Sequence, residues 1–532
     1  MKRALVILIV LLYPILLTLV QAQETEPPAK KIGREVAIER HLQDDEEFRI
    51  SLPELIAYGK KLFNANWTEQ DGGGRPLTKG NGKGLSDPQD PLVKGRSFNR
   101  ISGPDANSCA GCHNAPYGIA GGGGDFVGSV FVLGQRFDFV TFDPKDTIPT
   151  KGAVDERSQP VSLNNIANLR ATTGMFGAGY LEMLAREITE DLQRIRNSMR
   201  HGESRILESK GINFGRLTRR ADGMWDVSQV VGLPRASILT ATPQDPPSLV
   251  IRPWHQASNL VSLREFTNTA LNQHHGIQPT ERFGVATDPD GDGVTNEMTR
   301  ADVTALSVYQ AVLQVPGRVI PNDPEVEAAI LNGEKIFTRI GCSSCHIPAL
   351  PLSRRNWIYT EPNPYNPPTN LRVGETQTLK VDLNDPALPQ PRLKPTDPNA
   401  EWLMAPVFTD FKLHDITDPN DDYGVEPLDM NQNVWSKKFV AGNRKFLTKR
   451  LWGCANEPPY FHHGLFTTLR QAVLAHSGEA LQARQRFQGL SEYEQDSLIE
   501  FLKSLQVLPP DTKDVEVDEK YHAKKWSVTR SE

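Results

Sequence analysis

Cysteine is scarce in this sequence, and so is any surplus of charge. Only 5 of the 532 residues are cysteines, and 59 Lys and Arg stand beside 65 Asp and Glu for a net charge of −6. This balance excludes a disordered polyelectrolyte, and it excludes a nucleic-acid-binding protein with a dominant basic surface. Because thiols are so few, the positions of those present are informative.

Long hydrophobic runs are also missing, apart from one at the start of the chain. Residues 4–20 are apolar, follow a basic start and lead into the small-residue exit VQA at 20–22, which is typical of an export signal. An uncleaved anchor is the alternative, but Pro14 and the cleavage-like exit argue against it. We therefore expect residues 1–22 to be a signal peptide and the mature protein to be periplasmic, without a membrane span. Only an uncleaved signal would tether it to the membrane.

Four of the five cysteines fall in two copies of the pattern C-x-x-C-H. Residues 108–113 read SCAGCH and residues 341–346 read GCSSCH. Two thiols three residues apart reach both vinyl groups of one haem, and the following histidine is then held beneath the iron. A disulfide would not require histidine next in both copies, and zinc would require four ligands from one cluster. The sequence therefore predicts two covalently bound haem c groups, held by Cys109, Cys112, His113, Cys342, Cys345 and His346.

The sequence around the two motifs repeats itself. Residues 58–63 (YGKKLF) and 332–337 (NGEKIF) share a G-x-x-φ-F pattern, and an amphipathic segment at 498–505 closes the second half. Segments rich in Gly and Pro at 71–100 and 361–401 are expected to be loops, the second of them over the second unit. We expect a mostly α fold of two tandem cytochrome c-like haem domains with long Gly/Pro-rich loop insertions.

The predicted organisation has four parts. The signal peptide is followed by an N-terminal cytochrome c-like domain at 23–320 with the first haem and a C-terminal one at 321–510 with the second haem. A polar tail at 511–532 ends the chain. Cys454 lies outside both motifs, and we interpret it as a small buried hydrophobic residue rather than a reactive thiol.

Three further stretches of the sequence carry a family resemblance. They read SLRE at 262–265, FTDFKLHD at 408–415, and LWG at 451–453 followed by PYFHHG at 459–464. Together with the haem motifs they resemble signatures of the bacterial di-haem cytochrome c peroxidase and MauG superfamily, and most closely its di-haem oxidoreductase branch. The chain departs from these signatures at two positions, where the family has Asp and Met: His463 and Ile416.

For the second haem, the resemblance implies a sixth iron ligand fourteen residues past the histidine of the family's PYxHDG signature. Counting from His462, this position is His476. A haem bound by His346 and His476 would be low-spin and of low potential, and it would transfer electrons. The alternative is a solvated histidine at the end of a helix.

For the first haem, the resemblance implies a distal group that moves protons, because cleavage of a peroxide bond needs a base and then an acid. The family's catalytic glutamate maps to Glu265, and His255 lies near the position of a distal polar group in the relatives. Glu182 is the next candidate. A displaceable sixth ligand could come from His274 or His275. The plain alternative for Glu265 is a surface glutamate on a helix.

A candidate calcium loop lies between the two halves. Residues 288–297 read DPDGDGVTNE, which places three carboxylates at alternate positions as in half of an EF-hand loop: Asp288, Asp290 and Asp292. The twelfth position holds Thr299 instead of Glu, so Glu297 would have to substitute. Related peroxidases hold calcium between their haem domains. An acidic turn that caps the following helix is the alternative.

These features predict a peroxidase-type oxidoreductase. The haem at His346 would receive electrons from an electron-donor protein or a quinol-linked cytochrome, and the haem at His113 would meet hydrogen peroxide or another oxidant. One rival is an electron carrier without catalysis, in which both irons are six-coordinate. Another is a haem oxygenase or MauG-like oxidase that acts on an organic or protein substrate. All three stay open, since they differ in the occupancy and polarity of one distal pocket.

Overall fold

The computed structural model describes most of the chain after residue 31. The chain divides into two compact units, Met1–Glu35 and Val36–Glu532, and the elements below belong to the second. No described helix is long and apolar enough to cross a membrane. The predicted signal peptide lies outside the described residues, which are 32–73, 106, 108–124, 126–130, 167–288, 293–353, 357–395, 397, 399–418, 420, 424–426, 429, 431–432 and 436–526.

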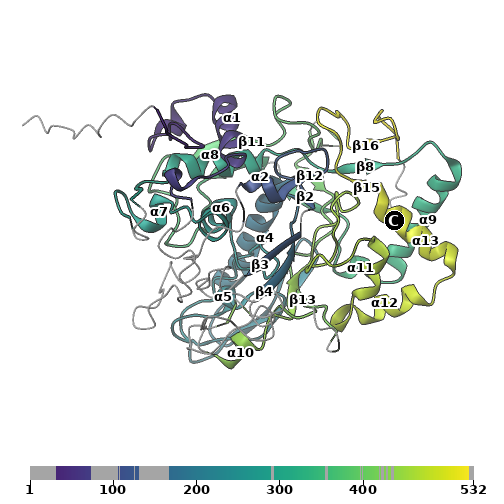
Figure 1. The fold of residues 1–532 in the computed structure, drawn as a ribbon. Helices are drawn as coiled ribbons and strands as arrows, with labels where there is room; N and C mark the ends of the chain where they lie inside the picture. Colours follow the sequence, from purple (N-terminus) through teal and green to yellow (C-terminus); the bar gives the residue numbers. More distant parts are fainter. Residues whose placement is uncertain are drawn as a thin grey trace, which may run out of the picture. The chain divides into compact units, whose positions relative to one another are not determined.

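A pair of packed helices begins the fold (Figure 1). Helix α1 (Leu52–Phe63) starts with a capping box at Ser51, which satisfies amides at its exposed end. It packs on α8 (Arg300–Ala311), where a Cβ on Gly59 would overlap the carbonyl oxygen of Ala305. Glycine is therefore required here, because the two backbones approach too closely for a side chain.

The same packing recurs near the C-terminus. Helix α9 (Pro324–Arg339) packs on α13 (Glu492–Ser504), and a Cβ on Gly333 would overlap the carbonyl oxygen of Ser497. Gly59 and Gly333 are the glycines of the repeated G-x-x-φ-F pattern. The repeat in the sequence thus corresponds to a repeated helix pair in the structure.

The expected mostly α fold is wrong. Of the described residues 32% are helical and 17% lie in strands, which form several small sheets. The segments between the helices pair with one another as short strands, because buried backbone groups need hydrogen-bond partners. The two-stranded antiparallel sheets are β1 (His113–Ala115) with β2 (Gly123–Gly124), β3 (Phe126–Val130) with β4 (Ala167–Ala171), β9 (Leu350–Ser353) with β12 (Trp402–Ala405), β10 (Ile358–Glu361) with β11 (Leu379–Asp382), and β13 (Leu413–Asp415) with β14 (Lys445–Leu447).

A three-stranded antiparallel sheet shows how local sequence sets such pairing. Strands β5 (Glu203–Ser209) and β6 (Ile212–Arg219) are joined by a two-residue turn, and β7 (Trp225–Val230) pairs with β6. Both turn residues, Lys210 and Gly211, have positive φ angles of 52° and 78°. Such a turn matches the twist of the flanking strands.

The remaining helices lie around the two helix pairs and the small sheets. The longest is α4 (Ala178–Ser198), which is buried along most of its length. The others are α2 (Cys109–Cys112), α5 (Arg235–Ile238), α6 (Leu263–Ala270), a π-helix (Leu271–His275), α7 (Thr280–Phe283), α10 (Lys437–Val440), α11 (Leu469–Ala475), α12 (Leu481–Gln488) and 3-10 turns at Glu46–Phe48, Glu69–Asp71, Cys342–Ser344 and Gly478–Ala480.

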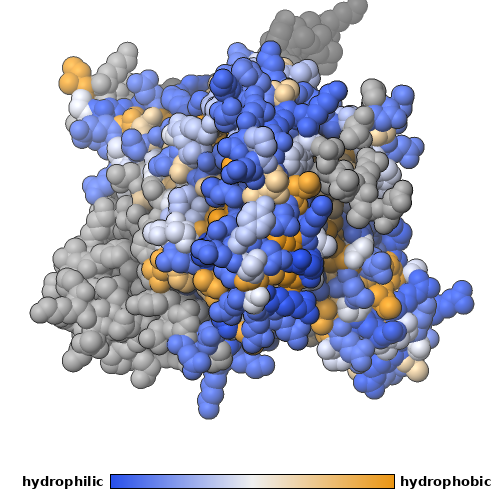
Figure 2. All heavy atoms as spheres, turned by 90° about the vertical axis from the view of Figure 1, so that its right-hand side faces the viewer, coloured by the Kyte–Doolittle hydropathy of each residue, from blue (hydrophilic) through white to orange (hydrophobic). Residues whose placement is uncertain are grey.

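Buried apolar side chains form two main clusters. The larger includes Leu55, Leu184 and Leu306 from α1, α4 and α8, and the smaller includes Phe337 and Phe501 from α9 and α13. Figure 2 views the side that carries α9 and α13, where the surface is mostly hydrophilic with hydrophobic residues between. The domain boundary near residue 320 stays a prediction.

The segment 361–401 does not lie over the second unit as expected. Glu361 accepts a hydrogen bond from Arg264 at 3.0 Å, and Asn366 accepts one from the hydroxyl of Ser262 at 2.5 Å. Both donors belong to α6 or its cap, so the segment packs against the first half of the chain. The composition of this segment indicated a loop in the sequence, but some of its polar side chains form buried hydrogen bonds with the first half of the chain.

Part of the predicted polar tail is folded. Strand β16 (Glu516–Val517) pairs in parallel with β8 (Gly317–Val319), which also pairs with β15 (Leu505–Gln506). Val517 is fully buried in this sheet. Residues after α13 therefore add two strands to the small sheet around β8, which lies between the two helix pairs (Figure 1).

Candidate functional site

One cavity brings both C-x-x-C-H motifs together. It has a volume of about 580 Å³, and its lining includes all six motif residues: Cys109, Cys112, His113, Cys342, Cys345 and His346. None of the five cysteines, all of which are described, forms a disulfide. Burial raises the pKa of Cys109 and of Cys342 to about 12, so these thiols are neutral at neutral pH. A space of this size is typical of ligand and cofactor sites.

The first motif sits on a short capped turn. The side chain of Ser108 accepts from the amide of Gly111 at 3.0 Å, which starts α2. The Nδ1 atom of His113 lies 3.0 Å from the carbonyl oxygen of Gly122. Burial lowers the pKa of His113 to about 4, so the ring is neutral. With Nδ1 hydrogen-bonded to a carbonyl, Nε2 is the nitrogen left to bind a metal.

The second motif repeats this arrangement. His346 places Nδ1 3.1 Å from the carbonyl oxygen of Phe408, and burial lowers its pKa to about 4. Its ring centroid lies 6.4 Å from that of Phe337, and that of His113 lies 6.1 Å from Phe63. Both phenylalanines come from the G-x-x-φ-F pattern, so each helix pair supports one motif histidine.

His476 faces His346. It is the C-terminal cap of α11, and its Nδ1 atom lies 2.7 Å from the carbonyl oxygen of Ala472, which leaves Nε2 free for a metal. The two ring centroids are 6.3 Å apart with an angle of 65° between the planes. Two imidazoles that bind one metal ion from opposite sides, each through a nitrogen at roughly 2 Å, have centroids about this far apart. Burial lowers the pKa of His476, so the ring is neutral and suited to binding iron.

Helix α6 lies at the first motif as α11 lies at the second, but it has no histidine at the position that corresponds to His476. Helices α6 and α11 begin with the caps Ser262 and Thr468, which accept from amides three residues on at 3.0 and 3.2 Å. Eight residues past these caps stand Ala270 and His476, and both line the cavity. The position that holds His476 in the second half of the chain thus holds the methyl group of Ala270 in the first.

Glu265 and Glu182 are not among the described residues that line the cavity. Glu265 is buried, and its Oε2 atom accepts from the amide of Val261 at 2.6 Å. Glu182 accepts from the amide of Leu263 at 2.7 Å and pairs with Arg186. Both carboxylates therefore bind backbone amides at the start of α6, and Glu265→Gln stays an open test of its role.

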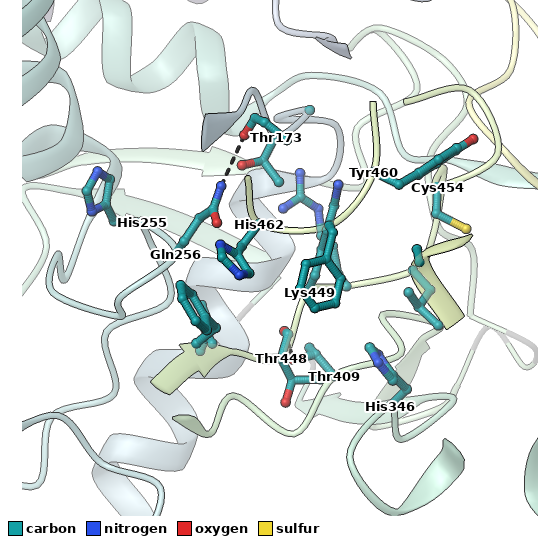
Figure 3. A pocket seen from close by; sticks show the side chains of 18 of the residues that line it. Thr173, His255, Gln256, His346, Thr409, Thr448, Lys449, Cys454, Tyr460 and His462 are labelled. Carbon is teal, nitrogen blue, oxygen red and sulfur yellow. Dashed lines mark hydrogen bonds between the residues drawn. The ribbon is translucent and has the colours of Figure 1, made fainter. Parts of the chain in front are cut away.

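His255 does line the cavity. One guanidinium nitrogen of Arg170 contacts its Nε2 atom, and Arg170 also pairs with Glu426 at 3.3 Å. Burial, and after it the charge of Arg170, lowers the pKa of His255 well below 6.5, so the ring is neutral. His255 has a φ angle of 67°, which is uncommon for a residue with a side chain. Figure 3 shows His255, His462 and His346 around the same cavity, each from a separate segment.

The π-helix after α6 brings two more histidines to the first motif. His274 and His275 line the cavity, and Nε2 of His275 lies 3.5 Å from the sulfur of Cys109. Its Nδ1 atom lies 2.9 Å from the carbonyl oxygen of Ala106. Such π-turns are frequent at functional sites. The role of a displaceable ligand remains a prediction for this pair.

A row of ring contacts leads inward from His476. Its ring lies 5.5 Å from Phe461, Phe461 lies 4.8 Å from His462, and His462 stacks on Phe446 at 3.8 Å. The carbonyl oxygen of His462 accepts from the amide of Ala171, next to Arg170. The row therefore connects the second motif with the wall that carries the contact of Arg170 with His255.

The charges around the cavity suit an anionic cofactor. Among the described residues the lining has one carboxylate, Glu479, and five Lys and Arg side chains: Arg170, Lys449, Arg450, Arg484 and Arg486. Within the same described residues, the Nε atom of Arg484 is buried without a hydrogen-bond partner. Each haem carries two propionate carboxylates, and buried cations require such partners. The residues present therefore fit two haems. Sequence reasoning missed these arginines, which form no motif.

The zinc alternative finds little support. Among the described residues, the one group of potential metal ligands is Cys345, Asp410 and His414. His414 lies 2.8 Å from Asp410 and 2.7 Å from Glu479. Although burial lowers it, hydrogen bonds to these neighbours raise the pKa of His414 to about 11, so the ring is a cation. A cationic imidazole cannot bind a metal.

The calcium loop is described only in part. Asp290 and Asp292 lie outside the described residues. The Oδ2 atom of Asp288 accepts from the amide of Gly293 at 3.0 Å. Glu297 is buried, and its Oε2 atom accepts from the amide of Gln278 at 2.7 Å. The following helix, α8, is capped by Thr299, so calcium stays a prediction for this loop.

Cys454 is buried, as expected, and its sulfur lies 3.7 Å from the carbonyl oxygen of Leu502. Burial raises the pKa of its thiol to about 12. A neutral buried thiol is a poor nucleophile. This supports a structural role beside the second motif.

Comparison with known proteins gives one family match. Residues 403–505 match the family described as "Di-haem oxidoreductase, putative peroxidase". The resemblance to di-haem oxidoreductases is therefore confirmed. No curated protein matches the chain. A solved structure of hydrazine synthase from Kuenenia stuttgartiensis, pressurised with xenon, is similar at 14% identity, covers 95% of this chain and 100% of that chain, and has a TM-score of 0.33. The matched region holds His414, Cys454, His462 and His476, and the family name indicates haem as the cofactor.

Proposed function

We propose that this chain is a c-type di-haem oxidoreductase of peroxidase type. The carrying observation is the contrast between His476 and Ala270 at the same position of two matching helices. A permanently filled sixth position suits electron transfer, and a position that is open, or that His274 or His275 fills only as a displaceable ligand, suits reaction with an oxidant. The family match over residues 403–505 supports the oxidoreductase class.

The motif residues would hold the cofactor. Cys109 and Cys112 would form thioethers with one haem and Cys342 and Cys345 with the other, while His113 and His346 would bind the irons through Nε2. The haem would supply reversible one-electron chemistry and, where its sixth position is open, a binding place for peroxide. The carbonyl oxygens of Gly122 and Phe408 fix the orientation of the two rings.

In the second unit, His476 closes the distal side. The carbonyl oxygen of Ala472 fixes its tautomer, so Nε2 faces His346 across the space for the haem. This unit stores the electron and excludes small oxidants. The row Phe461, His462 and Phe446 provides close packing toward the first unit.

In the first unit, Ala270 leaves room for an oxidant, and Phe266 lines the same wall with its ring 6.5 Å from that of His113. Of the two predicted proton-transfer residues, His255 lines the cavity and Glu265 does not. We therefore assign proton transfer to His255. Burial and Arg170 keep this ring neutral and disfavour its protonation, so it would take the proton of a peroxide as Arg170 moves from Nε2 to the negative charge that develops on oxygen.

We also propose a setting and partners for the protein. The export signal at residues 1–22 supports a periplasmic location, where haem c attachment is completed. An electron-donor protein or quinol-linked cytochrome would reduce the second haem, and hydrogen peroxide or a related oxidant would react at the first. Calcium at Asp288, Asp290 and Asp292 remains part of the proposal.

Electron paramagnetic resonance of the oxidised holoprotein tests the proposal. We expect one low-spin and one high-spin ferric signal, and His476→Ala should remove the low-spin signal while both haems stay covalently attached. Leu474→Ala, an exposed position on the same helix, is the control and should change neither signal.

Two outcomes would favour the rivals. Two low-spin signals that persist after partial reduction, without any reaction with peroxide, would leave an electron carrier. A high-spin signal without peroxide turnover, but with oxidation of an added organic or protein substrate, would leave an oxygenase or MauG-like oxidase.

A further inference from the structure

Two arginines that line the cavity have no close partner in the described part of the chain. Neither Arg450 nor Arg484 makes a hydrogen bond or a close ion pair there; the Nε atom of Arg484 is fully enclosed, and Arg450 has only the more distant charge of Glu457, which also lies near Lys449. The other cations of the lining are engaged: Arg170 pairs with Glu426 at 3.3 Å, Lys449 lies 3.8 Å from Glu457, and Arg486 donates to the carbonyl oxygen of Ile340 at 3.3 Å. Enclosed cations without an anion are costly, so a partner is expected from within the cavity.

Each of the two arginines belongs to a segment at a different haem site. Arg484 lies on α12, which packs against α11, the helix that ends at His476. Arg450 lies three residues after Leu447, whose amide donates to the carbonyl oxygen of Gln256 next to His255. Both side chains line the same cavity as the motifs they approach. The two cations are thus distributed one to each haem site.

The chemistry of the side chain points to a carboxylate. A guanidinium offers paired N–H donors in a planar fork that matches the two oxygens of a carboxylate. The one carboxylate of the described lining, Glu479, is already bound to His414 at 2.7 Å and to the amide of Asp415 at 3.0 Å. No protein acid of the described lining is therefore left for Arg450 or Arg484.

We propose that Arg450 binds a propionate of the haem held at His113, and that Arg484 binds a propionate of the haem held at His346 and His476. The proposal rests on the proposed function, since it requires a haem at each motif. Each pair neutralises a carboxylate at the edge of its haem. Removal of either cation should therefore disfavour the ferrous state of that haem alone, because reduction adds negative charge.

The test compares the reduction potentials of both haems in the holoprotein by spectroelectrochemistry. We expect Arg484→Gln to lower the potential of the low-spin haem only, and Arg450→Gln to lower that of the high-spin haem only. Resonance Raman spectra should show a shifted propionate bending mode in each glutamine variant. Arg484→Lys should keep most of the reduction potential of the low-spin haem, because the positive charge remains. It should still shift the propionate bending mode, because an ammonium cannot form the paired hydrogen bonds of a guanidinium. The lysine variants also serve if a glutamine variant fails to fold.

Arg339→Gln is the control, since Arg339 is exposed, is not among the residues that line the cavity and pairs with Glu494 at 2.5 Å. It should change neither potential nor the propionate modes. Unchanged potentials and modes in both glutamine variants that carry two covalent haems would overturn the propionate assignment alone. Mass spectrometry that finds no covalent haem on the wild-type protein would overturn the proposed function itself.

Discussion

The two haem units agree on one side of the expected cofactor and differ on the other. On the proximal side each has a helix pair packed at a glycine, a phenylalanine about 6 Å from the motif histidine, and a backbone carbonyl on its Nδ1 atom. On the distal side α11 presents His476, whereas α6 presents Ala270. A repeated scaffold thus places the two motif histidines alike while one position of the facing helix differs, and we propose that this position decides whether an iron is closed.

The largest effect should come from making the two units alike. Ala270→His places an imidazole where His476 stands in the second unit, so we expect it to bind the first iron and close it. Peroxide turnover should fall to background, and the high-spin signal should become low-spin.

Ala270→Val is the control for this change, because it adds bulk without a ligand atom. It should lower turnover less and keep the high-spin signal. Retained turnover in Ala270→His with a low-spin first haem would contradict the assignment of that haem as the reaction site.

The next largest effect concerns proton transfer in the first unit. His255→Ala should lower peroxide turnover by about 10²–10⁴-fold, which is the usual contribution of a general acid or base. Glu265→Gln should lower it by less than about tenfold, because the carboxylate holds the amide of Val261 instead of lining the cavity. Steady-state peroxide turnover of both variants, measured with the spectra of both haems recorded, would decide between His255 and Glu265. The reverse order of the two effects would return the role to Glu265.

Short local patterns in the sequence identified residues that the structure brings together. The two motifs and His476 line one cavity, and Phe63 and Phe337 of the repeated pattern lie beside the motif histidines. The roles of the motif residues and His476 as haem and iron ligands stay predictions. Glu265 shows the limit of such mapping, since the third position of a helix is where a glutamate most often binds backbone amides near the cap.

The errors lie where contacts are distant in the sequence. The mostly α prediction failed because the connecting segments form small sheets. Some of these pair locally, as β5 and β6 do across a two-residue turn, and others pair over almost 200 residues, as β8 and β16 do. The placement of 361–401 failed for the same reason, since its buried partners Ser262 and Arg264 precede it by about 100 residues. Arg450 and Arg484 belong to no motif, and only the cavity reveals them.

A smaller effect tests the shared scaffold. Gly59→Ala and Gly333→Ala should each destabilise the holoprotein by about 1–3 kcal/mol, since the added methyl group overlaps a backbone carbonyl of the partner helix. Denaturant unfolding followed by haem absorbance would measure both. Similar losses would support equivalent helix pairs. A neutral Gly59→Ala beside a costly Gly333→Ala would show that only the second unit depends on this close packing.

The smallest effect should come from the caps of the two distal helices. Thr468→Ala removes an exposed cap from α11 and should cost about 1 kcal/mol. Ser262→Ala removes the buried cap of α6 and also leaves the side-chain oxygen of Asn366 without its donor, so it should cost about 2 kcal/mol. The same unfolding measurement applies, with the low-spin signal as a second readout. Because α11 carries His476, Thr468→Ala should also weaken that signal on heating, whereas Ser262→Ala should leave it unchanged. Equal costs for the two variants would show that the contact with the 361–401 segment adds nothing to the stability of α6.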